Sequence, residues 1–459
     1  MVVNSKREID LIGRVWTSPE VYANLEALCD LGSRFTGTES ARLARDFILG
    51  KFKDYGLENP RLATFDYLGW TRGEAKVCIV APASDPLPSA ISLVYSPSTP
   101  ADGLLAEVID VGMGTKAEYA AKGAEIRGKF VLASSDSPRG GRRVHRREKY
   151  GRAVSGSAAG FLFANHLPGL LAPTGSLRAG TLAAIPGVGL SYEDGFRIRR
   201  ALRGAQPLEL DMRLTNQTGL SEFSHVIGEV PGAQDDDKEV VVVGAHYDGH
   251  DISQGAVDNG SGTALVLELA RLFAPLSGQL RRTVRFETYA AEEIGLYGST
   301  RYVNGMGESD LAKVAFMLNL DGGALSGDRG LVLQGLSELH PLFAAFAHEM
   351  GYHLSLSDNV STASDHYPYF LRGVPCASLV GNTPLGLGRG FGHTKADTLD
   401  KVNEVELRES AMVAARLLLR LANHPQSIGR MRTPAEIRQI LLDHNLEEPL
   451  KAQGEWPFD

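Results

Sequence analysis

Three short apolar segments in the second half of the chain each run directly into acidic residues or a histidine. The first, residues 240–243, consists of four valines, a pattern typical of a strand that is covered on both faces of a parallel sheet. Strand-like segments follow at 283–289 and 314–320, with a further one at 375–380. Apolar residues at helical spacing lie between the first two, at 265–273. This alternation of strand and helix predicts an α/β domain.

The rest of the chain lacks this regular alternation of strand and helix. A helix is predicted to start at 17–20, where Thr-Ser-Pro-Glu offers a cap, a proline and an acid. A second helix is predicted from Thr38 to Gly56, with Leu43, Phe47, Ile48 and Phe52 on one side. Residues 82–216 are short segments separated by Gly, Pro and Ser, with strand-like runs at 129–133 and 161–164. They predict a separate, mostly β domain. Late helices are predicted near 405–421 and 434–442.

Composition excludes several classes of protein. The 459 residues suggest two or three domains. With 47 basic and 55 acidic residues the formal charge is −8, which argues against a nucleic-acid or anionic-membrane partner. The basic cluster at 139–149 is interpreted as a solvated loop, because no aromatic residues are interleaved with its charges.

The cysteines and the amino-terminal residues bear on the cellular compartment. The three cysteines are far apart and have no CxxC spacing, which excludes a disulfide scaffold and a cysteine-based zinc site. The first residues, MVVNSKREIDLIGRVW, carry charges where a signal peptide would be apolar. We therefore expect a cytoplasmic protein that does not span a membrane.

Residues that can bind metals or transfer protons cluster after the predicted strands. Each has an ordinary alternative: Asp258 could cap a helix, and Glu292 and Glu293 could be solvated charges. In a parallel sheet, however, the carboxyl ends of the strands meet at one edge, where ligands and catalytic groups collect. The residues concerned are His246, Asp248, Asp258, Glu292, Glu293, Asp321 and His393.

Two imidazoles and several carboxylates at one edge predict a metal centre. Zinc accepts both His nitrogen and carboxylate oxygen, and two metals about 3.5–4 Å apart require a bridging carboxylate. Asp258, next to Gly260 and Gly262, is suited to bridge. Asp248 is the natural acceptor for the second ring nitrogen of His246. Of two adjacent glutamates on extended backbone, one could bind metal and the other act as general base.

The motifs HYDGH, GAVDNGSG, AAEEIGLYGS, NLDGG, ASDHYPYFLRGVP and GHTKADTLDKV, in this order, resemble the M28 family of co-catalytic zinc exopeptidases. The resemblance implies two Zn²⁺ per chain, with Co²⁺ or Mn²⁺ as possible substitutes. It implies that His246 and Asp321 bind one zinc, that Glu293 and His393 bind the other, and that Asp258 bridges them. Glu292 would be the general base and Asp248 the residue that orients His246.

The segments LLAEVIDVGMGT, IRGKFVLASS and AAIPGVGLSYEDG resemble a protease-associated (PA) domain. The two resemblances together imply a three-layer α/β fold, in which a mixed sheet is flanked by helices (the zinc exopeptidase fold), with a small β-rich domain inserted. The expected division is 1–83 plus 217–430 for the peptidase domain, 84–216 for the insert and 431–459 for a C-terminal helix and tail.

The expected function is hydrolysis of the N-terminal residue of peptide substrates. A carboxypeptidase or dipeptidase on the same metal core, a receptor-like binding protein without catalysis, and glutaminyl cyclisation are the alternatives. The residue before His393 is Gly392, so the donor to the oxyanion stays open among Tyr247, Tyr367 and Ser364. His250 and Asp251 are interpreted as supporting or surface polar residues. The sequence leaves the oligomeric state open.

Overall fold

The computed structural model describes residues 5–233, 239–323, 326–381 and 391–458. Two compact units are present: unit 1 comprises Met1–Asp66, Glu222–Gly392 and Asp397–His444, and unit 2 comprises Tyr67–Ser221, His393–Ala396 and Asn445–Asp459. The units change over inside strands β1 (Glu58–Thr71) and β10 (Gln217–Val230). The division expected from the sequence, 1–83 plus 217–430, 84–216 and 431–459, stays a prediction.

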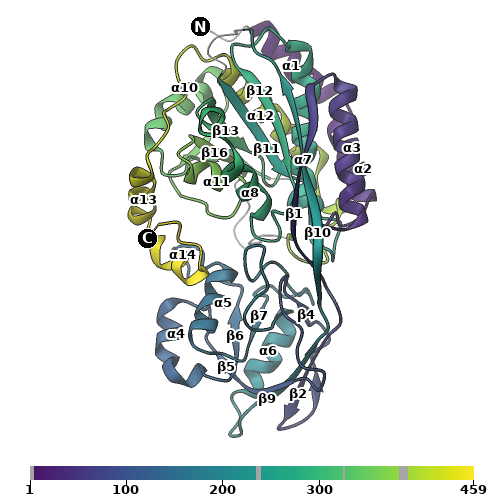
Figure 1. The fold of residues 1–459 in the computed structure, drawn as a ribbon, viewed down its shortest axis with the longest axis vertical. Coiled ribbons are helices and arrows are strands. Elements are labelled where there is room, and N and C mark those ends of the chain that lie inside the picture. The colour runs from purple at the N-terminus through teal and green to yellow at the C-terminus, as the bar shows by residue number, and fades with distance from the viewer. Residues whose placement is uncertain (1–4, 234–238, 324–325, 382–390, 459) are drawn as a thin grey trace. The chain divides into compact units, whose positions relative to one another are not determined.

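The described part of unit 1 contains an eight-stranded mixed sheet of order β1-β10-β12-β11-β13-β16-β14-β15 (Figure 1). Its centre is parallel, since β11 pairs in parallel with β12 and β13, and β13 with β16. Antiparallel pairs flank this centre, β10 with β12 and β14 with β16. The remaining strands are β11 (Val240–His246), β12 (Thr283–Tyr289), β13 (Val314–Asn319), β14 (Arg329–Val332), β15 (Ser355–Ser357) and β16 (Cys376–Gly381).

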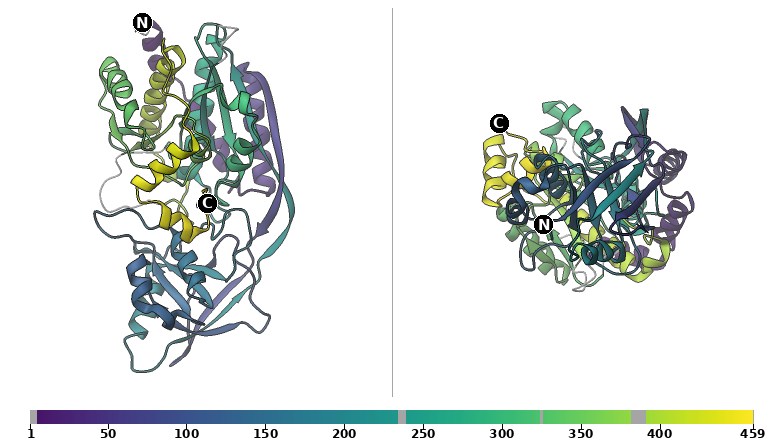
Figure 2. Two further views of the ribbon diagram at one scale, coloured as in Figure 1. Left: turned by 60° about the vertical axis from the view of Figure 1, so that its left-hand side comes forward. Right: turned by 90° about the horizontal axis from the view of Figure 1, so that it is seen from below.

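Helices cover this sheet in two groups (Figure 1, Figure 2). Helix α7 packs on β11 and is contacted by α1, α2, α3 and α12, while α11 packs on β13 and β16 beside α8. This arrangement confirms the expected α/β class. The helices are α1 (Ser5–Thr17), α2 (Glu20–Asp30), α3 (Glu39–Tyr55), α7 (Ser261–Phe273), α8 (Tyr297–Gly305), α9 (Glu308–Leu311), α10 (His340–Met350), α11 (His366–Leu371), α12 (Glu404–Asn423) and α13 (Pro434–Asp443).

Local sequence explains the ends of α3. The side chain of Thr38 accepts a hydrogen bond from the Ala41 N–H, and Gly56 ends the helix in the left-handed conformation (φ 82°). These are the cap and stop that the sequence predicts. Ile48 and Phe52 are buried as predicted, but Leu43 is exposed and Phe47 only half-buried, and Ala41 and Ala44 complete the buried face.

Unit 2 is built on a second mixed sheet, of order β3-β2-β9-β5-β6-β7-β8-β4. One apolar cluster includes Ile198 of α6, and a second includes Tyr119 of α4 and Tyr150 of α5. The elements are β2 (Ala75–Ala81), β3 (Asp85–Pro86), β4 (Ile91–Ser92), β5 (Leu104–Asp110), α4 (Lys116–Lys122), β6 (Phe130–Ser134), α5 (Arg146–Ser155), β7 (Gly160–Ala164), β8 (Gly187–Leu190), α6 (Tyr192–Ala201), β9 (Glu209–Leu214) and α14 (Glu447–Gln453).

The interpretation of 139–149 as a solvated loop is wrong for its second half. Helix α5 begins at Arg146, and the side chains of residues 146–149 are buried. Two of these groups bond to the backbone: Arg146 donates to the carbonyls of Thr174 and Ser176, and Lys149 donates to those of Ser134 and Asp136. Glu148 instead forms ion pairs with Arg142 and Arg152. A basic cluster can therefore be internal where carbonyl oxygens converge on it.

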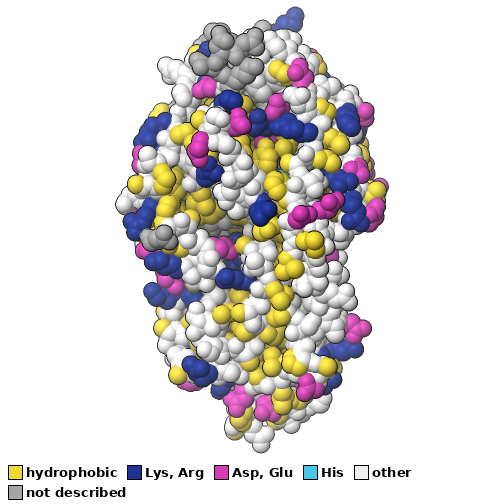
Figure 3. Space-filling view, viewed as in Figure 1, with side chains coloured by type: hydrophobic (Ala, Val, Ile, Leu, Met, Phe, Trp, Pro, Cys, Tyr) yellow, Lys and Arg dark blue, Asp and Glu magenta, His cyan; other side chains and the backbone are white. Residues whose placement is uncertain are grey.

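None of the described helices is long and apolar enough to cross a membrane. On the face of the molecule in Figure 3, described basic and acidic side chains are interspersed rather than gathered by sign.

The burial of a leucine in this fold predicts how much its side chain contributes to the free energy of unfolding. Leu318 lies fully buried in β13, between β11 and β16, so we expect Leu318→Ala to lower the free energy of unfolding by about 2–5 kcal/mol. Leu43→Ala is the matched control, because Leu43 is 46% exposed. We expect it to lower the free energy of unfolding by about 0.5 kcal/mol or less. Denaturant midpoints measure both changes, and equal shifts would contradict the placement of β13 in the core.

Candidate metal centre

The carboxyl ends of the three central strands lie at one edge of the unit 1 sheet. His246 is in register with Tyr289 of β12, and Gly244 is in register with Asn319 of β13. The segments that leave these strands, 247–258, 290–293 and 320–321, therefore start side by side. This is the arrangement that the sequence predicts for the acid- and histidine-bearing segments.

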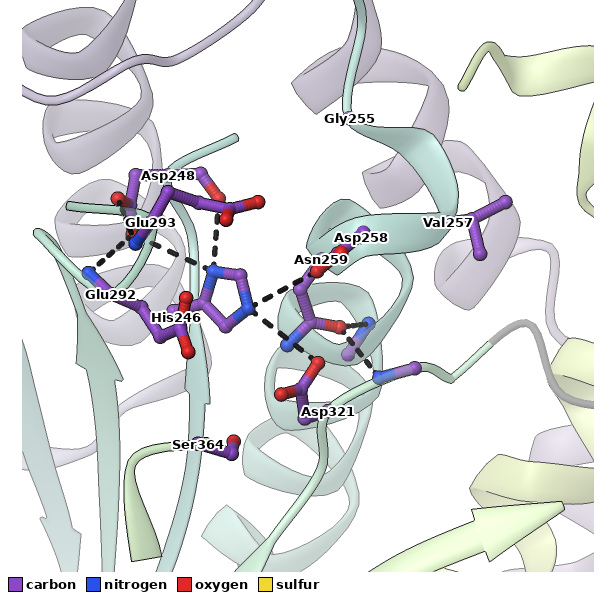
Figure 4. A network of polar contacts seen from close by, with 12 residues as sticks. His246, Asp248, Gly255, Val257, Asp258, Asn259, Glu292, Glu293, Asp321 and Ser364 are labelled. Carbon is purple, nitrogen blue, oxygen red and sulfur yellow. Dashed lines mark hydrogen bonds and ion pairs between the residues drawn. The ribbon is translucent and has the colours of Figure 1, made fainter. Parts of the chain in front are cut away.

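His246 lies at the centre of this edge (Figure 4). Its Nε2 is 3.4 Å from Oδ1 of Asp258 and 3.5 Å from Oδ1 of Asp321. These separations are long for hydrogen bonds, but they suit atoms that each lie about 2.0–2.2 Å from one shared zinc ion. The other ring nitrogen, Nδ1, is 3.0 Å from the carbonyl oxygen of Asp248 and 3.5 Å from its carboxylate. One nitrogen is thus fixed by Asp248 while the other faces two carboxylates.

The carboxylate of Asp248 holds the backbone of the neighbouring strand end. It is fully buried and accepts hydrogen bonds from the N–H of Glu292 (3.3 Å), the N–H of Glu293 (3.2 Å) and the hydroxyl of Thr36 (3.0 Å). The Thr36 hydroxyl oxygen accepts in turn from the N–H of Ala291 at 3.0 Å. Asp248 therefore contacts His246 and also places the two glutamates, a second contact that sequence reasoning did not find.

Asp258 lies in a π-helical turn, Ala256–Gly260, immediately before α7. It does not cap the helix, because the residue at the N-cap is Gly260, so the capping alternative is wrong. Asp397 stabilises this turn, because its carboxylate accepts hydrogen bonds from the N–H of Val257 (2.7 Å) and of Asp258 (3.1 Å). Burial, helped by the charge of Asp258, raises the pKa of Asp397 to about 6.

Asn259 connects this turn to the end of β13. Its Oδ1 accepts from the N–H of Gly262 (2.9 Å) and of Gly322 (3.0 Å), and its Nδ2 donates to the carbonyl of Leu320. A Cβ at Gly262 would collide with the Leu320 carbonyl oxygen, so only glycine allows this approach. The segments bearing Asp258 and Asp321 are consequently fixed to each other.

Arg34 is a buried organiser of the site that sequence reasoning missed. Its side chain is 0% exposed and donates to the carbonyls of Tyr247 (2.8 Å), Gln254 (2.6 Å) and Gly255 (2.8 Å). A guanidinium group has five N–H donors, so one arginine can bind several carbonyl oxygens of the loop after β11 at once. No pattern around residue 34 indicated this contact, which spans more than 200 positions.

The adjacent glutamates have different partners. Glu292 is half-buried, and ligand atoms of Glu292, His246 and Asp321 all lie within 4.8 Å of one another. Glu293 is buried, and its Oε2 is 2.9 Å from Nε2 of His250. The two carboxylates therefore serve separate positions, but the expected extended backbone is not present, because Glu292 lies in a bend and Glu293 in a turn after β12.

Crowding of carboxylates perturbs the titration of the site. Burial raises the pKa of Glu292 well above its usual range, and the negative charges of Glu293 and Asp321 add to this rise. Burial alone would lower the pKa of His246, but the charge of Glu292 and the carboxylates that bond to the ring raise it well above its ordinary value. A site that gathers this much negative charge around an imidazole fits a divalent cation.

His393 belongs by its contacts to unit 2. Its backbone carbonyl accepts from the N–H of Thr174 at 2.8 Å, and its Nδ1 is 3.2 Å from the Thr174 carbonyl. Its role as a ligand beside Glu293 stays a prediction. The structure brings together the six other predicted residues, all in unit 1: His246, Asp248, Asp258, Glu292, Glu293 and Asp321.

Two of the candidates for the oxyanion donor already have hydrogen-bond partners in the structure. The hydroxyl of Tyr247 donates to the carbonyl of Ser224 at 2.8 Å. The hydroxyl oxygen of Ser364 accepts from Nδ2 of Asn319 at 2.8 Å. The donor stays undecided.

The site defines a class: a metal-binding α/β protein whose donors lie at the strand ends of a mixed sheet. Residues 225–418 match the profile of peptidase family M28, and residues 91–198 match that of the PA domain. Residues 225–418 therefore form a domain of peptidase family M28; the protein is a metallo-exopeptidase, and its PA domain is inserted between two parts of the peptidase unit.

Named relatives agree with this family. Aminopeptidase YwaD of Bacillus subtilis (strain 168) is 26% identical over 419 residues, which cover 89% of this chain and 85% of the relative. Leucine aminopeptidase 2 of Trichophyton rubrum is 33% identical over 252 residues, but the match covers 55% of this chain and only 47% of that relative. Carboxypeptidase Q of Rattus norvegicus is 25% identical over 432 residues, covering 89% and 86%.

Solved structures share the architecture. The structure of a peptidase M28 precursor from Shewanella amazonensis SB2B has a TM-score of 0.77 and 26% identity, covering 94% of this chain and 99% of that one. The aminopeptidase from Aneurinibacillus sp. strain AM-1 has a TM-score of 0.70 at 23% identity, covering 93% and 98%.

The buried side chain of His225 predicts how the stability of the protein depends on pH. His225 lies among four aromatic rings, and its Nδ1 accepts from the N–H of Ala290 at 3.0 Å. Burial lowers the pKa of His225 to about 4. The unfolded chain takes up this proton near pH 6.5 and the folded chain does not, so stability falls as the pH drops from about 6.5 to about 4, by up to about 3 kcal/mol.

NMR titration of the imidazole measures this pKa directly, and unfolding midpoints at pH 7 and pH 5 measure its effect on stability. The variant His225→Gln, which carries no titrating ring, should show a shallower loss between these pH values. A midpoint near 6.5 for His225 in the folded protein would contradict the account.

Proposed function

We propose that this protein is a zinc-dependent aminopeptidase that removes N-terminal residues from peptides at a two-metal site. The observation that carries the proposal is the convergence of Nε2 of His246 on carboxylate oxygens of Asp258 and Asp321 at 3.4 and 3.5 Å, beside Glu292. The names of the relatives Aminopeptidase YwaD and Leucine aminopeptidase 2 support the choice of reaction.

The donor set fits zinc, because it combines imidazole nitrogen with carboxylate oxygen. In the proposal His246 and Asp321 would hold one ion, Glu293 and His393 would hold the second, and Asp258 would contribute its carboxylate to both. Such ions supply Lewis acidity to the scissile carbonyl and stabilise the negative charge that develops there.

Glu292 is the proposed general base. Its backbone is fixed through the Asp248 carboxylate. Burial raises the pKa of its own carboxyl well above the usual range, and a raised pKa favours a carboxyl group that both accepts and returns a proton. Its carboxylate would take a proton from the attacking water and pass it to the leaving amine nitrogen. Asp248 keeps His246 and the glutamate backbone in place during these transfers.

An aminopeptidase is favoured over a carboxypeptidase by the names of the relatives Aminopeptidase YwaD and Leucine aminopeptidase 2. A carboxypeptidase or dipeptidase is the second candidate, because the match to Carboxypeptidase Q covers 89% of this chain.

The proposal is tested with aminoacyl anilides, short peptides and their N-acetylated counterparts. Free-amine substrates should be cleaved, and acetylation should abolish turnover, because it removes the charge that the site pairs with. A chelator should remove activity, and zinc, cobalt or manganese should restore it. Full turnover after metal removal would reject the metal mechanism, and faster cleavage of acetylated peptides would favour the carboxypeptidase.

Substitution of Glu292 tests whether this residue acts as the general base or as a metal ligand. We expect Glu292→Gln to lower kcat by about 10²–10⁴-fold, because an amide cannot accept the proton, while zinc content stays at the wild-type level. Glu26→Gln, at an exposed position on α2, is the matched control and should leave kcat unchanged. An active Glu292→Gln enzyme, or a loss of rate explained by lost zinc, would exclude Glu292 as the base.

A further inference from the structure

His250 lies outside the ligand set that the sequence predicts, yet it faces that set. Its side chain is buried, with 2% of the residue exposed, and its Nε2 is 2.9 Å from Oε2 of Glu293. Both residues belong to unit 1. Of the two interpretations of His250, the surface polar residue is therefore wrong, whereas the supporting residue agrees with the contact to Glu293.

The loop that carries His250 is tightly held. Arg34 donates to the carbonyls of Tyr247 and Gln254, on either side of the histidine. The loop packs so closely that a Cβ at Gly249 would lie 3.0 Å from the carbonyl oxygen of Ser33. The imidazole is also stacked on Phe35, with ring centroids 6.4 Å apart and planes 28° apart. These contacts orient the ring before any ligand arrives, as a binding site requires.

The chemistry of the two atoms and the distance between them allow the pair to bind a metal. A buried imidazole nitrogen next to a carboxylate oxygen is a donor pair that zinc accepts. Two atoms that each lie about 2.0–2.2 Å from one ion can be at most about 4 Å apart, and the 2.9 Å between Nε2 and Oε2 is within that limit. One ion can therefore contact both atoms without rearrangement of the loop.

We propose that His250 supplies a nitrogen ligand to the metal ion held by Glu293. The inference rests on the proposed function, since it concerns one of the two ions of that site. The ion bound by Glu293 would then have two histidine ligands, His250 and the predicted His393. The ion bound by His246 and Asp321 would have one. Removal of His250 should consequently weaken one zinc site and leave the site of His246 and Asp321 intact.

The test uses the full-length protein and zinc alone. Metal content after dialysis and competition with a chromophoric chelator give the number and affinity of zinc ions in the wild type, His250→Ala and His250→Gln. We expect two ions in the wild type and a loss of about 100-fold or more at one site in both variants, at or beyond the upper end of the effect of removing residues that only support ligands. His348→Ala, at an exposed histidine of α10, should bind like the wild type.

Visible absorption of the Co²⁺-loaded proteins distinguishes a ligand from a neighbour. Loss of a nitrogen donor should shift and weaken the bands of one cobalt ion in His250→Ala, whereas the His348→Ala spectrum should match the wild type. His250→Gln can still donate a hydrogen bond to Glu293 but is a poor zinc ligand, so wild-type affinity in this variant would overturn the proposal, as would a change below about threefold in His250→Ala.

The outcomes also separate this inference from the proposed function. If the wild type binds two zinc ions and is active while His250→Ala binds them equally well, the role of His250 is refuted and the peptidase assignment stands. If the wild type binds no zinc, both are refuted. Should His250→Ala fail to fold, the affinity and cobalt spectrum of His250→Gln decide.

Discussion

The buried carboxylate of Asp248 joins the ends of two neighbouring strands, and the geometry of the site depends on it. One side of the residue faces His246 at the end of β11, and the other accepts the backbone N–H groups of Glu292 and Glu293 after β12. Three hydrogen bonds to one buried carboxylate hold both strand ends against it. Two parallel strands thereby present an imidazole and two carboxylates in a fixed relation.

The same principle extends around the site. Asp397 holds the turn that carries Asp258, Asn259 connects that turn to the end of β13, and Arg34 fixes the carbonyls of the loop after β11. None of these three side chains belongs to the predicted ligand set. They are polar groups with hydrogen-bonding partners, and such networks specify one arrangement when every member is satisfied. The acidic donors can then face one another at the cost of mutual repulsion, which a bound cation relieves.

Much of unit 1 could be predicted because local pattern and topology agree there. The apolar runs became β11, β12 and β13, and the parallel register brought their carboxyl ends to one edge. The cap at Thr38 and the stop at Gly56 are read from neighbouring residues, so α3 was also accessible. Helix α1 was not predicted, since its few buried apolar positions, such as Leu11 and Val15, are separated by charged residues.

What the sequence could not give was contact between distant segments. Arg34 bonds to carbonyls more than 200 positions away, and the burial of Lys149 depends on the carbonyls of Ser134 and Asp136 in its own unit. His250 looked like an ordinary polar residue because only the folded chain places Glu293 beside it. Motif order indicated the chemistry, but the supporting residues follow from tertiary structure alone.

The central claim is that this edge of the sheet holds a pair of divalent ions. Anomalous X-ray scattering from crystals grown with zinc, recorded on both sides of the zinc absorption edge, tests it most directly. The account predicts two anomalous peaks, one against His246 and Asp321 and one against Glu293, with Asp258 reaching towards both. Crystals with no zinc peak at these residues, or with zinc bound only elsewhere on the molecule, would contradict it.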